Sequence, residues 1–339
     1  MSKIVIDAFG GDNAPVEIVK GAIEFINEVN DVDVVLVGKE KEISMELSKY
    51  DFDMNRVTIE NANDVIDNND TPTVAIRQKK DSSLVKAFDY LNAHDDAVGV
   101  LSAGSTGAVL TGGFLKIGRI KGVQRPALCP LIPTISGGRV ALCDCGANMD
   151  CKPQYLLQFA ILASEYMRNV EGIENPRVGL LNVGTEDHKG NPFTQEVFAL
   201  LKDCADVNFV RNMEARDAMS GNYDVVVADG FNGNVLLKSM EGTALSIVNV
   251  LKDDIKSHKL SMFGALFMKG TFKRLKKVLD YHSSGGAILL GCKKLLVKAH
   301  GSCTAVSVKA CLYQINDMYK SNITGLIAEK VAKVGAFNE

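Results

Sequence analysis

Short apolar runs rich in β-branched residues alternate with longer segments of helical periodicity along most of this chain. The first run, KIVIDAF, precedes a helical pattern at residues 15–29, and the second, VDVVLVG, precedes another at residues 40–50. Strands that alternate with helices build β-α-β units, in which the strands run parallel. The sequence therefore predicts a three-layer α/β/α fold, doubly wound around one mostly parallel sheet. Further predicted strands cover residues 57–60, 97–102, 139–143, 177–182, 207–210 and 225–228.

The pattern changes near residue 235. A long helical stretch at residues 235–256 carries no strand signal, and a basic and apolar segment follows it. We expect a single catalytic domain over residues 1–339, with a helical excursion at residues 235–285. Strand-like segments return in GAILLG and in HGSCTAVSV, and a final helix is predicted over residues 310–335.

Composition excludes several functional classes. A hydrophobic content of 46% suffices for a sizeable core, and a net charge of -3 gives no reason to expect nucleic acid as a partner. The first dozen residues lack a signal-peptide pattern, and no apolar run approaches the roughly 20 residues that cross a bilayer. Cys143, Cys145 and Cys151 do not follow the spacing of zinc ligands, so we expect buried thiols and no metal.

The segments that follow the predicted strands are rich in glycine, asparagine and aspartate. At the carboxyl ends of parallel strands such loops meet in one crevice, where their backbone N–H groups can contact a ligand. The same residues also suit tight turns, so a purely structural role stays open for each loop. The loops are DAFGGD (7–12), SAGSTGA (102–108), DCGANMD (144–150), NVGTEDHKGN (182–191) and DGFNGN (229–234).

Two loops carry the groups best suited to an anion. The second loop precedes an apolar helical segment, and the start of a helix attracts anions through unpaired N–H groups and the helix dipole; helix capping is the structural alternative. In the fourth loop, Lys189 can neutralise phosphate and His188 can move a proton near neutral pH, unless this is a solvated loop. A basic run, RQKKDSS at residues 77–83, fits a solvated helix face or a contact with an anion or a carrier protein.

Seven segments together resemble one family. IDAFGGDNAP, RQKKDSS, SAGSTGA, DCGAN, LLNVGTEDHKGN, DGFNGNVLLKSMEG and HGS stand in the order found in the PlsX family of acyl-ACP:phosphate acyltransferases, and the resemblance covers nearly the whole chain. One local departure is VIDNNDTP, just before RQKKDSS. The resemblance implies a fold related to phosphotransacetylases and isopropylmalate-type dehydrogenases, and a homodimer without metal or nucleotide cofactor.

The resemblance also implies a reaction and its setting. A long acyl chain moves from acyl carrier protein to inorganic phosphate, and the acyl phosphate passes to a membrane glycerol-3-phosphate acyltransferase in phospholipid synthesis. The protein is then expected in the cytoplasm, associated peripherally with the inner face of the cell membrane.

This chemistry needs positioning more than a strong base. Phosphate is ionised at pH 7 and the leaving thiol has a pKa of about 8.5, so no serine nucleophile is required, and the chain has no G-x-S-x-G motif. We expect Lys189, His188 and the second loop to hold phosphate, Asn234 and Asn182 to donate to the thioester oxygen, and Asp229 with Asp144 to orient them. The remaining predicted binding residues are Gly10, Gly11, Asp12, Ser102, Gly104, Ser105, Thr106, Asn148 and Glu186.

The basic and apolar segment after residue 257 predicts membrane contact. Its large apolar residues recur at near-helical spacing among lysines, a pattern typical of helices on anionic membranes. A dimer contact is the alternative, and both can hold together. The predicted contact residues are Leu260, Phe263, Leu266, Phe267, Lys269 and Lys273.

Three rival functions stay open at this point. A phosphotransacetylase-like enzyme acting on short acyl-CoA would share the thioester chemistry. A nicotinamide-dependent dehydrogenase would need a dinucleotide fingerprint or a metal site, and the sequence has neither. A non-catalytic lipid or carrier-protein scaffold would gain nothing from lysine, histidine and asparagine at successive strand ends.

Overall fold

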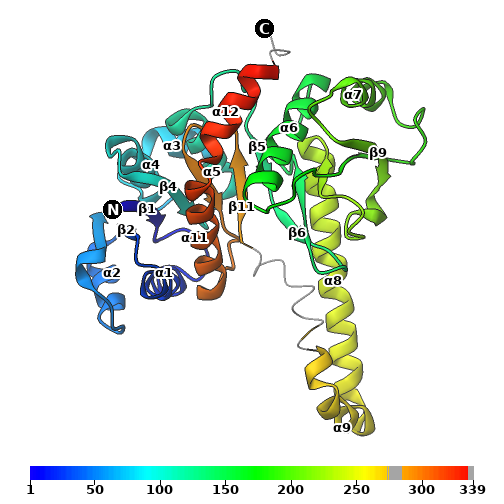
Figure 1. The fold of residues 1–339 in the computed structure, drawn as a ribbon. Helices are drawn as coiled ribbons and strands as arrows, with labels where there is room; N and C mark the ends of the chain where they lie inside the picture. The colour runs from blue at the N-terminus through cyan, green and yellow to red at the C-terminus, as the bar shows by residue number, and fades with distance from the viewer. Residues whose placement is uncertain (273, 275–284, 335–339) are drawn as a thin grey trace.

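The computed structural model describes residues 1–272, 274 and 285–334, and its largest sheet has seven strands (Figure 1). The strands lie in the order β3-β2-β1-β4-β12-β11-β5. All neighbours from β3 to β12 are parallel, whereas β11 is antiparallel to both of its neighbours. The bounds are β1 Ser2–Asp7, β2 Val32–Gly38, β3 Val57–Asn61, β4 Ala97–Ser102, β5 Ala127–Cys129, β11 Ala287–Leu290 and β12 Leu295–Lys298.

A second sheet has five strands in the order β6-β7-β10-β8-β9. Only β6 is antiparallel to its neighbour. The bounds are β6 Leu131–Pro133, β7 Arg139–Cys143, β8 Val178–Asn182, β9 Phe209–Glu214 and β10 Val225–Val227. Two sheets therefore stand where the sequence predicted one, because the chain crosses at Pro130 from β5 in the first sheet into β6 in the second. The assignment of residues 1–339 to a single domain stays a prediction.

Helices cover both faces of the large sheet, as a doubly wound fold requires. In β1, Ile4 and Ile6 belong to one buried cluster and Val5 to another, because successive side chains point to opposite faces of a strand. The first cluster includes α1, which packs on α11, and the second includes α4. Helix bounds are α1 Val16–Glu28, α2 Glu40–Leu47, α3 Pro72–Gln78, α4 Ser83–Ala93, α5 Thr106–Gly112, α6 Pro153–Asn169, α7 Pro192–Asp203, α11 Ala305–Lys320 and α12 Ile323–Val334.

Three sequence expectations need correction near the strand ends and the C-terminus. The strand predicted at residues 207–210 is β9, which begins at Phe209 and ends at Glu214. The segment HGSCTAVSV is not a strand: it forms a turn and then enters α11 at Ala305. The single final helix predicted at residues 310–335 is two helices, because Asn322 takes a left-handed conformation (φ 52°) between α11 and α12.

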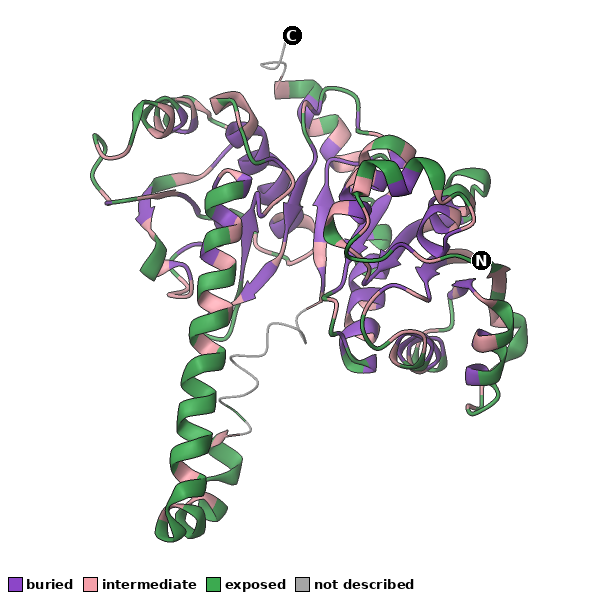
Figure 2. Cartoon of the chain, turned by 180° about the vertical axis from the view of Figure 1, so that it is seen from behind, coloured by how far each residue is buried: buried purple, intermediate pink, exposed green. Residues whose placement is uncertain are grey.

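A helical arm projects from the body of the molecule. Helix α8 (Gly230–Ser257) begins beside the second sheet and extends well beyond it, and α9 (Lys259–Phe267) folds back at its tip (Figures 1 and 2). Only Gly230, Gly233 and Leu236 of α8 are buried, and no residue of α9 is. Helix α8 begins at Gly230, five residues before the predicted helical stretch. The assignment of an excursion to residues 235–285 stays a prediction, and residues 273 and 275–284 lie outside the described residues. No described helix combines the length and apolar character needed to cross a bilayer.

Candidate functional site

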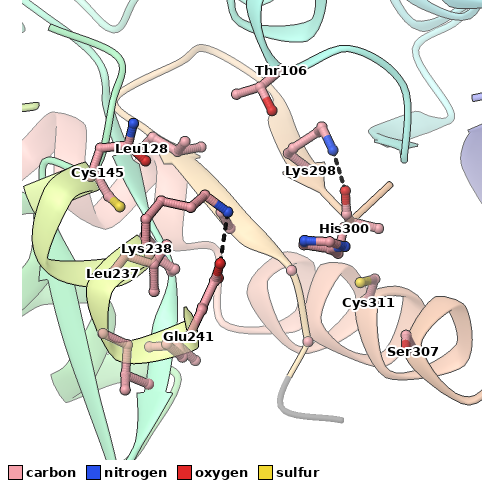
Figure 3. Close-up of a pocket in the computed structure, with 18 residues that line it drawn as sticks. Thr106, Leu128, Cys145, Leu237, Lys238, Glu241, Lys298, His300, Ser307 and Cys311 are labelled. Carbon is pink, nitrogen blue, oxygen red and sulfur yellow. Dashed lines mark hydrogen bonds and ion pairs between the residues drawn. The ribbon is translucent and has the colours of Figure 1, made fainter. Parts of the chain in front are cut away.

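A cleft of about 840 Å³, counting the part open to solvent, lies where the two sheets meet (Figure 3). Strands β11 and β12 and helix α11 form one wall, and the first turns of α8 form the other. The crossing segment from Leu128 to Ile132 lies between them. Small-molecule sites are commonly clefts between packed units of a fold, lined by apolar residues and a few polar groups. We therefore take this cleft as the candidate active site.

The first wall carries a buried lysine. Lys298 ends β12 and is only 8% exposed, and its Nζ donates to the carbonyl oxygens of Ala299 and, at 3.4 Å, Ala103. Burial lowers the pKa of Lys298 to about 8, while the neighbouring Cys303 and Cys311 thiols act in the opposite direction. Near neutral pH the cleft thus contains an ammonium group with little access to water.

His300 lies two residues beyond Lys298 on the same wall (Figure 3). Its Nδ1 accepts from the Ser302 amide at 3.2 Å and lies 2.9 Å from the Ser302 hydroxyl. An amide can only donate, so the neutral ring carries its proton on Nε2. Thr106, at the start of α5, also lines this wall and adds a hydroxyl.

The opposite wall comes from α8. Asn234, Leu237, Lys238 and Glu241 line it, and Lys238 Nζ pairs with Glu241 Oε2 at 2.7 Å. Residues three and four apart lie on the same face of a helix, which is why this set faces the cleft together. The wall presents one amide side chain and one ion pair to a ligand.

The remainder of the cleft is largely apolar. Its lining residues carry few polar side-chain atoms, and several belong to the crossing segment between the sheets. The cleft thus combines a polar wall, suited to an anion, with an apolar surface, suited to a hydrocarbon chain. These residues are Leu128, Pro130, Leu131, Ile132, Cys145, Leu237, Ala287 and Cys311.

The first two predicted loops meet each other at this wall. The Ser102 hydroxyl donates to Asp7 Oδ2 at 2.7 Å and accepts from the Gly104 amide at 3.0 Å. Burial raises the pKa of Asp7, and the hydrogen bond from the Ser102 hydroxyl acts against this rise. Any side chain at Gly10 would meet Asp7 Oδ2 and the Gly104 nitrogen at 2.6 Å, so the two loops touch backbone to backbone.

The first loop also reaches the His300 turn. The Asp12 amide donates to the Gly301 carbonyl at 2.8 Å, and the Cβ position of Gly11 is 2.9 Å from the same oxygen. Among the residues predicted in these two loops, Thr106 lines the cleft itself. The others lie outside its lining: Gly10, Gly11, Asp12, Ser102, Gly104 and Ser105.

The third and fifth loops follow the neighbouring parallel strands β7 and β10 and meet at the carboxyl ends of these strands. Asp144 is fully buried and accepts from four backbone amides and from the Asn148 side chain. Burial raises the pKa of Asp144, and the amides of Leu128 and Asn148 act against this rise. Asp229 caps α8 by accepting from the Asn232 amide at 2.8 Å, and Gly230 N donates to Asn148 O at 2.8 Å. Asp229 thus fixes the start of α8, and Asp144 fixes the third loop against which this helix packs. That the two aspartates orient the reacting groups stays a prediction.

The fourth loop stands apart from the cleft lining. Asn182 Nδ2 donates to the Lys189 carbonyl at 3.2 Å, and the Glu186 carbonyl accepts from Asn212 Nδ2 at 2.8 Å. The His188 carbonyl accepts from Gln195, and the His188 side chain is exposed. The structure therefore brings Thr106 and Asn234 to the cleft but places Asn182, Glu186, His188 and Lys189 outside its lining.

Sequence reasoning missed the charged residues that line the cleft. Lys298 interrupts the apolar run LLVKA, and a lone lysine at the end of a buried strand was a usable signal. His300 stood in the HGS segment, which contributed only to the family resemblance. Lys238 and Glu241, an i, i+3 pair, stood in the DGFNGNVLLKSMEG segment, which likewise contributed only to the family resemblance. Within the described ranges no His, Cys, Asp and Glu side chains cluster in the manner of metal ligands.

Comparison with known proteins places this geometry in a family. The model of the family described as fatty acid synthesis protein matches residues 2–325. The chain belongs to this family, the PlsX family. A phosphate acyltransferase from Clostridium novyi is 46% identical over 97% of this chain and 98% of its own length. A phosphate acyltransferase from Bacillus subtilis is 44% identical, with 97% and 98% covered.

Solved structures confirm the fold of this family member. The EutD phosphotransacetylase from Staphylococcus aureus superposes with a TM-score of 0.56 at 15% identity, covering 97% of this chain and 94% of its own. A putative 4-hydroxythreonine-4-phosphate dehydrogenase from Salmonella typhimurium gives 0.52 at 12% identity, with 94% and 99% covered. The predicted α/β fold of the phosphotransacetylase and dehydrogenase type is thus confirmed.

Proposed function

We propose that this protein is a phosphate acyltransferase that moves an acyl chain from a thioester to inorganic phosphate. The observation that carries the proposal is the cleft itself, in which a buried ammonium group and a histidine lie beside an apolar surface. Phosphate needs cations and N–H donors, whereas an acyl chain needs an apolar surface. The names of the curated relatives support the same reaction.

The chemistry divides among groups at the cleft. A phosphate oxygen attacks the thioester carbonyl, and the thiolate leaves with the electron pair of the broken C–S bond. The Asn234 amide and His300 Nε2–H are suited to donate to the carbonyl oxygen as negative charge develops on it. Lys189, His188 and Asn182 stay in the proposal as groups of the fourth loop, which lies outside the cleft lining.

Long-chain acyl-acyl carrier protein is the acyl donor we propose. The apolar surface along the crossing segment suits a long hydrocarbon chain better than an acetyl group. The resemblance of the sequence motifs to the PlsX family supports the carrier protein as the thioester form. The product, acyl phosphate, would then serve a membrane glycerol-3-phosphate acyltransferase.

The decisive experiment follows thiol and acyl phosphate together. Purified protein is incubated with palmitoyl-acyl carrier protein with and without phosphate, free thiol is titrated, and acyl phosphate is identified by mass spectrometry. We expect both products to appear in equal amounts and only with phosphate. Thiol release without acyl phosphate would instead identify a thioesterase, and absence of release would contradict the proposal.

A phosphotransacetylase-like reaction on short acyl-CoA is the second candidate, and the fold shared with the EutD enzyme favours it. Acetyl-CoA and palmitoyl-acyl carrier protein are compared in the same assay. Faster turnover of acetyl-CoA would select the second candidate.

The projecting arm supports a homodimer and a peripheral membrane contact. Helix α8 exposes apolar side chains at Ile247, Val250 and Leu251, a spacing that forms one stripe along a helix. A second copy packing along this stripe would cover it. The α9 tip exposes Leu260, Phe263, Leu266 and Phe267, with Lys269 just beyond. Lys273, also predicted at the membrane, lies outside the described residues.

A further inference from the structure

Lys298 is a buried cation at the end of β12. Its side chain is 8% exposed, yet among the residues that the structure describes no Asp or Glu oxygen lies within ion-pair distance of its Nζ. Its hydrogen bonds go to two backbone carbonyls. Buried lysines are rare unless an anion pairs with them, because the desolvated charge costs free energy. Within the described part of the chain, the Lys298 charge thus has no carboxylate counterion.

The position of this charge is set by rigid elements. Strand β12 lies between β4 and β11 in the large sheet, with Lys298 paired in register with Ser102 of β4. The Ser102 hydroxyl is in turn fixed by Asp7. Lys298 also lines the cleft together with Thr106 and His300, as Figure 3 shows. A ligand in the cleft would therefore find three fixed polar groups on this wall.

We propose that Lys298 is the cation that binds the phosphoryl oxygens of the phosphate substrate, with the Thr106 hydroxyl donating beside it. This assignment rests on the proposed function. The tetrahedral dianion supplies a counterion to the ammonium group, and the low surrounding dielectric strengthens the pairing. The apolar surface of the cleft then lies next to the bound phosphate, where the acyl thioester has to approach.

The charge state of Lys298 makes phosphate binding depend on pH. Burial lowers its pKa to about 8, with Cys303, Cys311 and Asp7 acting to raise it and Lys238 acting to lower it further. His300 and the Lys238–Glu241 pair are the other charged or titratable groups at the cleft. Above pH 8 an increasing share of Lys298 is neutral, so phosphate affinity falls. Inorganic phosphate itself is mostly dianionic above pH 7.5, so its own titration does not produce this loss.

The test measures phosphate binding and turnover separately. Wild type, Lys298→Met, Lys298→Arg and Lys293→Ala proteins are heated with increasing inorganic phosphate, and the shift in Tm gives the apparent affinity. Lys293 is exposed on the same β11–β12 connection and serves as the control. We expect Lys298→Met to weaken phosphate affinity and raise KM for phosphate about 10- to 100-fold, the range for a lost charged hydrogen bond. Lys298→Arg retains the charge and is expected to restore part of the affinity.

Two outcomes would overturn the inference. One is phosphate affinity in Lys298→Met equal to that of the Lys293→Ala control, and the other is wild-type affinity that does not decline between pH 7.5 and 9. Circular dichroism confirms that each variant is folded, and methionine keeps most of the volume of lysine. Phosphate protection that depends on Lys298 while no acyl phosphate forms would support the anion site and contradict the proposed function instead. Acyl phosphate formation that is unchanged in Lys298→Met would support the proposed function and contradict the assignment of Lys298 to the phosphate site.

Discussion

Lys189 and Lys298 are both candidates for the phosphate cation, but their surroundings differ. The Lys189 side chain packs near Gly184 on a loop outside the cleft lining, whereas Lys298 is buried within it. If Lys189 nevertheless contacts phosphate in the working enzyme, Lys189→Ala reduces turnover about 100-fold or more, as loss of a charge-stabilising donor does. Steady-state assays against Lys202→Ala, an exposed lysine that pairs with Asp187 of the same loop, provide the measurement. Near-normal turnover of Lys189→Ala would eliminate its proposed role.

The residues of the cleft show what sequence reasoning can and cannot reach. Asn234 and Thr106 were found because they follow strand ends in loops with visible turn chemistry. Lys298 was missed because it ends an apolar run, and an apolar run predicts that a segment is buried but not that it lines a site. Its function depends on which strand lies beside β12, and a long-range strand order is not encoded in local periodicity.

Helix α8 depends on a close backbone contact at its first turn. A Cβ at Gly233 would lie 2.0 Å from the Asp144 carbonyl oxygen, so Gly233→Ala forces α8 away from the third loop. We expect a loss of about 1–3 kcal/mol in the free energy of unfolding, the usual range for overpacking. Activity should fall as well, because Asn234 is the next residue.

Gly242 in the same helix is the matched control for this contact. Nothing lies within 4 Å of its Cβ position, so Gly242→Ala meets open space and gains about 0.5–1 kcal/mol from better helix propensity. Urea unfolding followed by circular dichroism compares the two variants. Equal effects from both substitutions would show that the contact with Asp144 does not hold the helix.

The elements themselves were predicted unevenly, for physical reasons. Strands β1, β2 and β4 were predicted within about one to two residues, because both of their faces are buried and their apolar runs are continuous. The division into two sheets was not predicted, since it depends on a crossing at one proline between two three-residue strands. The segment HGSCTAVSV was taken for a strand because it contains the β-branched residues Thr304, Val306 and Val308. It forms a turn and the start of α11, in which Val308 is buried and Val306 is exposed.

At the scale of the whole molecule, the arm ends in α9, the part of the arm farthest from the sheets, where the ribbon is coloured mostly as exposed (Figure 2). Leu260 is 83% exposed and Phe267 is 80% exposed. Transfer of such apolar side chains from water into a bilayer interface is favourable. We therefore expect wild-type protein to float with vesicles that contain anionic phospholipid, and the double variant Phe263→Ser/Phe267→Ser to remain largely in the soluble fraction.

The control for this prediction removes exposed apolar surface elsewhere. Met54 is 79% exposed and lies just before β3, far along the chain from the arm, so Met54→Ser should float like wild type. Vesicles of zwitterionic lipid alone separate the apolar contribution from that of the neighbouring lysines. If the double variant floats as well as Met54→Ser, the tip does not contact the membrane. Its apolar surface would then call for a protein partner, and a second copy packed along α8 would be the first to test, by measuring the mass of the double variant in solution.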